Sequence, residues 1–435
     1  MKHILFIAGW LLTASLIFGG ELTLSECQEK ARASHPLQDE LSNRQHIYEL
    51  ARKNLNANWL PTLDVNAQAL YNSDVVEFDR IMQNLTSMLP FDVPMQNVSS
   101  MPNEQYQATL DIRQMIYDGG ATRARKKMQT AELEADRRDI EVQLYQLDEQ
   151  VQSIYLGILL LEKRQQLAEL FQTELQNRLR AARAGVKNGM LLPSDLDVLR
   201  AEELKVEQQL AELNIRRTHL VKALAELIGE NIAANTKFAT PQVTVADTSV
   251  LARPELQLFA AQKQRLQTGL SLTKIQHRPK LFAFGSYGYG NPPGNDFFTD
   301  TFDTYYRVGA GLQWNLFDGL KTHREREQLM AQQRIVDAKE AAFRQRIQTA
   351  LEQQRAELES YRHLLQTDDK LIILRENIAD AAASKLDNGA ISATEYLTEL
   401  HAERQARLDK HVHELLLTKA KININHLTGQ LESEQ

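Results

Sequence analysis

The chain has 435 residues, of which one is cysteine, 11 are proline and 19 are glycine, and its formal net charge is −7. A single cysteine excludes an intrachain disulfide framework and a zinc site built from cysteines. The acidic charge, and the lack of a basic patch with interleaved aromatic residues, argue against a nucleic-acid partner.

The first 20 residues have the pattern of a secretory signal peptide. A positively charged start is followed by an apolar run over residues 4–18 and by two glycines. The run is shorter than the roughly 20 apolar residues that a membrane-spanning helix needs. We therefore expect the mature chain to begin near Glu21.

Two pairs of segments alternate apolar and polar residues, which is the period of a β-strand. The apolar series of the first pair is Leu63, Val65, Ala67, Ala69, Tyr71, then Ala108, Leu110, Ile112, Gln114, Ile116. The series of the second pair is Leu281, Ala283, Gly285, Tyr287, Tyr289, then Val308, Ala310, Leu312, Trp314, Leu316. Each strand has about ten residues, the length that crosses a bilayer when the strand is tilted. Polar, turn-rich loops over 72–106 and 290–304 join the strands of each pair.

Each strand pair is followed by a segment that predicts a very long helix. Residues 121–187 and 321–387 contain no proline, and each helix would be about 100 Å long at 1.5 Å per residue. Apolar residues recur every seven positions, which predicts coiled packing against neighbouring helices. The series are Leu147, Ile154, Leu161, Ala168, Leu175, Ala182, and Leu351, Leu358, Leu365, Ile372, Ala379, Leu386. Both helices end at Asn-Gly, and a helix of about 35 residues follows each turn.

The chain contains two copies of one structural unit. Asp118-Gly119 returns as Asp318-Gly319 and Asn188-Gly189 as Asn388-Gly389, both 200 residues later. We divide the chain into a signal peptide (1–20), a first repeat of helix, two strands, long helix and helix (21–230), a linker with some strand character (231–252), a second repeat (253–430) and a tail (431–435).

Four amphipathic strands cannot close a barrel, and an open strand edge is not tolerated in lipid. Membrane barrels of a single chain have about eight strands or more. The sequence therefore predicts a mainly α-helical fold with a membrane β-barrel portion that is completed only in an oligomer.

The chain resembles the outer-membrane efflux family, the TolC-like exit ducts. The resemblance is carried by the two strand-to-helix junctions, by Gly189 with the following run 194–202, and by Gly389 with Ser392 and Glu395. It implies a homotrimer with a twelve-stranded barrel in outer-membrane lipid above a periplasmic helical tunnel. It also implies a tripartite efflux or type I secretion system, in which the tips dock on a periplasmic adaptor fed by an inner-membrane pump of the RND, ABC or MFS class.

The apolar residues at the two helix-hairpin tips are candidate docking residues. Leu191, Leu192 and Ile391 lie beside the turn glycines Gly189 and Gly389. Exposed apolar side chains at a turn need burial or a partner. We expect them to contact a helix of the adaptor.

Charged residues at the same turns are candidates for an entrance gate, because rings of carboxylates in a symmetric oligomer favour cations. They are Asp195, Asp197, Asp387 and Glu395, with Arg183 and Lys385 near enough in sequence to pair with them. Ser194 with Asp197, and Ser392 with Glu395, also have capping-box spacing. The sequence leaves gating and capping open.

The barrel-to-tunnel junction is assigned to Asp118, Gly119, Asp318 and Gly319. A carboxylate caps a helix N-terminus well, and glycine permits the sharp turn from strand to helix.

An alternative is a soluble periplasmic adaptor or scaffold. It accounts for the helices and the signal peptide but not for the strand pairs with apolar faces. The sequence shows no catalytic constellation, metal-ligand spacing or cofactor motif, so we do not expect an enzyme.

Overall fold

The computed structural model describes residues 21–88, 101–296 and 299–430. The predicted signal peptide and C-terminal tail lie outside them. The chain forms two compact units, one of Met1–Asp39, Ile140–Pro254 and Phe343–Gln435 and the other of Glu40–Asp139 and Glu255–Ala342. Each unit takes segments from both predicted sequence repeats, so the division into repeats stays a prediction.

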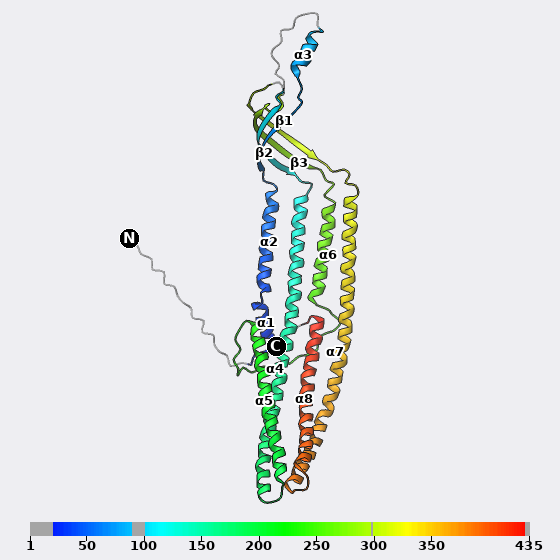
Figure 1. Ribbon diagram of the computed structural model, residues 1–435. Helices are drawn as coiled ribbons and strands as arrows, with labels where there is room; N and C mark the ends of the chain where they lie inside the picture. The colour runs from blue at the N-terminus through cyan, green and yellow to red at the C-terminus, as the bar shows by residue number, and fades with distance from the viewer. Residues whose placement is uncertain (1–20, 89–100, 297–298, 431–435) are drawn as a thin grey trace, which may run out of the picture. The chain divides into compact units, whose positions relative to one another are not determined.

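The elements follow the predicted order (Figure 1). The first half holds α1 (Leu24–Ser34), α2 (Leu37–Ala57), β1 (Thr62–Tyr71), α3 (Phe78–Thr86), β2 (Glu104–Tyr117), α4 (Ala121–Lys187) and α5 (Pro193–Ile228). The second half holds α6 (Pro254–Thr273), β3 (Lys280–Asn291), β4 (Asp303–Gln313), α7 (Lys321–Asp387) and α8 (Ala393–Thr428). The two long helices are confirmed at their predicted bounds.

Three details differ from the prediction. The short helix α3 lies in the segment expected to be a loop. Pro36 separates α1 from α2, because proline disfavours helix at the residue before it. Strand β4 ends at Gln313, so Trp314 and Leu316 do not extend it.

The sheet belongs to the second unit and has the antiparallel order β1-β2-β3-β4. Its register aligns the four apolar series: Val65 lies opposite Leu110, Leu110 opposite Tyr287, and Tyr287 opposite Tyr306. Residues directly opposite one another share a face in an antiparallel sheet. One face is therefore apolar across all four strands and the other is mainly polar, as the alternation predicts.

The helices of this unit follow the same order as the strands. Arg44 of α2 pairs with Asp136 of α4 at 3.2 Å, and Arg138 of α4 bonds to Gln257 of α6. Lys263 of α6 in turn pairs with Glu340 of α7 at 2.8 Å. Each helix lies beside the one that adjoins the neighbouring strand (Figure 1).

The other unit packs α1, α5 and α8 with the remaining parts of α4 and α7. All twelve predicted heptad residues are buried or half-buried, which confirms the coiled packing. Cys27 of α1 is fully buried, and burial raises the pKa of its thiol to about 12. The linker makes a single parallel bridge between Leu22 and Phe238. None of the described helices has an apolar stretch long enough to cross a membrane.

Candidate functional site

The apolar face of the sheet is exposed in the single chain. Val65 of β1 and Val308 of β4 are 78% and 81% exposed, and Leu63, Tyr287 and other members of the series are also accessible. Exposure of so many apolar side chains on one face is unfavourable in water. The two outer strands, β1 and β4, each have one edge without a strand partner among the described residues.

The opposite face carries a network of polar side chains. Asp111 of β2 accepts hydrogen bonds from Asn66 of β1 at 2.8 Å and from Thr109 at 2.7 Å. The guanidinium of Arg113 lies 4.3 Å from the ring centre of Phe282, which covers Gly311 of the next strand. Hydrogen-bonded polar side chains on this face are expected where a sheet is in contact with water.

The strand-to-helix junctions are capped by their aspartates. Oδ1 of Asp118 accepts from the N–H of Gly120 at 2.8 Å, and Oδ2 of Asp318 accepts from the N–H of Thr322 at 2.9 Å. Burial raises the pKa of Asp118, but hydrogen bonds from Thr122 and Gly120 outweigh it, and the pKa is lowered. Gly119 and Gly319 have φ of +71° and +65°, a conformation that glycine adopts without a steric penalty.

The two hairpin tips share one apolar cluster. The turn glycines Gly189 and Gly389 have φ of +71° and +68°. The partly buried Leu191 and Ile391, equivalent positions in the two repeats, pack against the cluster. The cluster itself is Phe171, Leu175, Leu179, Ala182, Leu199, Val206, Ala382, Ala383, Leu386, Ala393, Tyr396, Leu397 and Leu400. Of the apolar tip residues, Met190 and Leu192 remain exposed, at 55% and 66%.

Asp195 joins the two tips. Its Oδ2 accepts from the N–H of Leu192 at 3.2 Å, and its Oδ1 accepts from the N–H of Ala393, the first residue of α8, at 2.9 Å. The capping box expected for Ser194 with Asp197 is wrong, because α5 begins at Pro193, two residues earlier than this box requires, and Asp195 is the third helical residue. Ser392 and Glu395 form the expected box.

A second link at the tips joins α4 to α7 and α8. Arg178 donates to Asp387 at 3.1 Å and to the hydroxyl of Tyr396 at 3.1 Å. That hydroxyl donates to Glu174 at 3.4 Å. Burial raises the pKa of Tyr396 to about 12, and it also raises the pKa of Glu174. Tyr396 is therefore shielded from water, whereas Asp387 at the end of the network is half exposed.

The candidate gate residues are thus only partly brought together. Asp387 pairs with Arg178, and Asp197 pairs with Arg200 on its own helix at 3.4 Å. Arg183 and Lys385 are exposed, and neither lies within 4 Å of a carboxylate in the described part of the chain. Sequence reasoning missed Arg178, although its place between Leu175 and Leu179 puts it beside the predicted seam.

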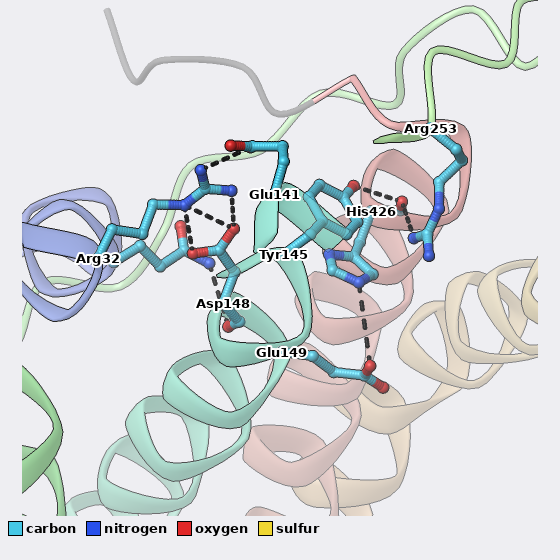
Figure 2. A network of polar contacts seen from close by, with 8 residues as sticks. Arg32, Glu141, Tyr145, Asp148, Glu149, Arg253 and His426 are labelled. Carbon is cyan, nitrogen blue, oxygen red and sulfur yellow. Dashed lines mark hydrogen bonds and ion pairs between the residues drawn. The ribbon is translucent and has the colours of Figure 1, made fainter. Parts of the chain in front are cut away.

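A buried polar network lies in the same unit, where α1, α4 and α8 meet Arg253, the residue just before α6 (Figure 2). Arg32 of α1 binds Asp148 at 2.6 Å and Glu141 at 2.9 Å. His426 of α8 stacks on Tyr145 with ring centres 4.2 Å apart, and Arg253 donates to its carbonyl at 2.9 Å. This network fixes the C-terminal end of α8 against α4.

Comparison with known families distinguishes the membrane channel from the soluble adaptor or scaffold, the two functions considered from the sequence. The profile of the family described as outer membrane efflux protein matches residues 39–230, which contain β1, β2, α4 and the first tip. Over these residues the chain is similar to the outer membrane efflux protein family. A sequence comparison with curated proteins returned no match.

Solved structures share the fold of this chain at low sequence identity. The outer membrane protein VceC of Vibrio cholerae is 15% identical, with a TM-score of 0.67 over 93% of this chain and 96% of that one. A membrane protein of Pseudomonas aeruginosa is 12% identical, with a TM-score of 0.68 over 94% and 92%. The MtrE outer membrane channel of Neisseria gonorrhoeae, solved in its open state, is 14% identical, with a TM-score of 0.64 over 93% and 88%.

The match to this family confirms the predicted localisation in the outer membrane, with a periplasmic helical portion, and agrees with a role in efflux. Members of the family are channels and not enzymes, as we expect for this protein.

Proposed function

We propose that the protein is the exit duct of a tripartite efflux or type I secretion system. Three copies would complete a twelve-stranded barrel, and their helices would form the wall of a periplasmic tunnel. The duct is passive: an inner-membrane pump of the RND, ABC or MFS class supplies the energy through a periplasmic adaptor.

The observation that carries this proposal is the register of the sheet. It places the apolar residues of four strands on one face, while β1 and β4 each keep an open edge. A sheet with a lipid-facing side cannot leave backbone N–H and C=O groups unpaired in hydrocarbon, so neighbouring copies must supply the missing pairs. Each of the two predicted repeats contributes one strand pair to that wall.

A seam on α7 supports assembly from several copies. Leu364, Leu371 and Ile378 recur every seven residues, and Leu374 lies on the same side of the helix. All four are exposed, from 37% for Leu364 to 60% for Leu374. A second heptad seam, distinct from the buried one, fits a helix of another subunit.

The tips support the docking part of the proposal. Leu191 and Ile391 shape the turns from inside the cluster, and Met190 and Leu192 provide the exposed apolar surface. A partner helix could cover both side chains together. The carboxylates of Asp195 and Asp387, held by Ala393 and Arg178, are the residues we assign to the entrance gate, with Asp197, Glu395, Arg183 and Lys385 on its rim.

Docking is tested by charging the exposed tip. We expect Leu192→Glu to abolish export of a fluorescent efflux dye from cells that carry the cognate pump and adaptor, while trimers still reach the outer membrane. Ser194→Glu is the matched control, because it adds the same charge two residues away and removes no apolar surface. Full export by Leu192→Glu would remove docking from the proposal.

A further inference from the structure

Basic residues gather where the helices meet the strands. Residues 121–127 hold four Lys or Arg, residues 274–280 hold three, residues 321–326 hold three, and Arg52 and Lys53 lie near the end of α2. Glu325 is the one acidic residue in these stretches. We call these four stretches the basic collar; it stands out in a chain whose net charge is −7.

Most charges of the collar are not neutralised within the described part of the chain. Among the described residues, only Lys321 of the collar lies near a carboxylate, at 3.9 Å from Glu325. Farther along the same helices the bases are paired, as Arg44 is with Asp136 and Lys263 with Glu340. Exposed collar residues such as Arg123, Arg125 and Lys127 therefore present unpaired positive charge to their surroundings.

The bases that begin α4 and α7 are unfavourable for these two helices, whereas those near the C-terminal ends of α2 and α6 suit the negative end of the helix dipole. The N-terminus of a helix carries a partial positive charge and prefers acidic residues in its first turn. Neither α4 nor α7 has an acidic residue there, and α4 places four bases within its first seven residues. Asp118 and Asp318 cap these two helices, but helix stability does not explain the bases that follow them in α4 and α7. Binding of an external anion would explain these bases.

The collar lies next to the apolar face of the sheet. At the same end of the strands, Trp59, Tyr117, Trp314 and Phe317 are all exposed, as expected for an aromatic girdle at a membrane surface. The bases follow within six or seven residues of helix, which is about 10 Å at 1.5 Å per residue. The headgroup layer beyond each side of the hydrocarbon core is about 5–7 Å thick, so the collar reaches this layer and slightly beyond it.

We propose that the basic collar binds the phosphodiester headgroups of anionic phospholipids in the periplasmic leaflet. The inference rests on the proposed placement of the sheet in the membrane. Clusters of Lys and Arg immediately beside a membrane-spanning segment attract anionic lipid. Bound lipid would offset the repulsion among the bases and fix the height of the barrel in the bilayer.

The native tryptophans of the chain can report on lipid binding at the basic collar. With residues 1–20 removed, it holds two tryptophans, Trp59 and Trp314, and both lie at the collar. The trimer is reconstituted in vesicles of phosphatidylcholine with a minor share of phosphatidylglycerol, and bromine, a quencher, is placed on the acyl chains of one lipid or the other. We expect bromine on phosphatidylglycerol to quench far more than its share, with an enrichment of about fivefold near the tryptophans.

The variant replaces the four bases of residues 121–127 by glutamine. Its matched control replaces Lys222, Arg362, Lys370 and Lys419, four exposed bases of the other unit, in the same way. We expect the collar variant to lose most of the enrichment and the control to keep it. Enrichment in the unmodified protein is itself a test that does not depend on the folding of either variant.

Three results would contradict the inference or the proposed function on which it rests. Equal quenching by the two brominated lipids in the unmodified protein would refute lipid selection by the collar. Loss of the preference in inorganic phosphate, but not in potassium chloride of equal ionic strength, would show a site for free phosphate instead. No quenching by either lipid would mean that the sheet is outside the bilayer, which contradicts the proposed function itself.

Discussion

The buried histidine of Figure 2 leads to a prediction about stability in acid. His426 is 7% exposed, its Nδ1 has no hydrogen-bond partner among the described residues, and its Nε2 lies 3.9 Å from Glu149. Burial, with further contributions from Arg253 and Arg32, lowers the pKa of His426 from 6.5 to about 4. The folded chain therefore keeps this imidazole neutral at a pH where the unfolded chain protonates it.

The direction and the size of this change in stability follow from the difference between the pKa values of His426 in the folded and unfolded states. As the pH falls below 6.5 the unfolded state gains a proton that the folded state refuses, and the loss of stability ends near pH 4. At 1.36 kcal/mol for each pH unit between these values, the full loss is about 3 kcal/mol. Roughly 2 kcal/mol of this is lost between about pH 7 and about pH 5.

The assay compares unfolding of the purified protein at several pH values, followed by circular dichroism of the helices. His426→Phe keeps the ring that stacks on Tyr145 but cannot be protonated, so it should flatten the acid side of the profile. His363→Gln, at an exposed position, should leave the profile unchanged. If His426→Phe loses stability with falling pH as steeply as the unmodified protein, the neutral buried state of His426 is wrong.

Three further changes test the sheet, the tips and the seam. Val308→Arg puts a charge on the apolar face near the middle of β4, where it should cost about 2–4 kcal/mol in lipid and reduce the yield of assembled barrel on heat-modifiability gels. Gln68→Arg, on the polar face, should assemble normally. Equal yields of the two variants would contradict contact of the apolar face with lipid. Asp195→Ala breaks the bond between the tips and should raise single-channel conductance in planar bilayers, while Glu207→Ala, at an exposed position of α5 outside the gate, should not; unchanged conductance and ion selectivity would argue against a gate. Leu371→Glu should weaken the trimer on a native gel, and an intact trimer would place the α7 seam outside the subunit contacts.

Periodicity made most of the fold predictable from the sequence. Strand alternation and the seven-residue repeat depend on which side of an element meets apolar surroundings, and the four strands and two long helices show both patterns clearly. The short helix α3 was missed because nine residues between polar turns give too few periods to recognise.

The contacts at the hairpin tips were less predictable from the sequence, because they join residues about 200 positions apart. Arg178 meets Asp387, and Asp195 meets Ala393, only once the two hairpins pack together. Local spacing also misplaced the cap of α5, where proline at the first helical position decided the boundary. Which of the apolar tip residues point inward depends on the cluster and not on the turn sequence.

The number of copies in the detergent-extracted particle tests the central claim most directly. Native mass spectrometry of the purified protein should give three copies of the mature chain, with twelve strands in one closed barrel when the same particle is imaged. A stable monomer that stays in solution without detergent, with β1 and β4 paired inside one chain, would contradict the account.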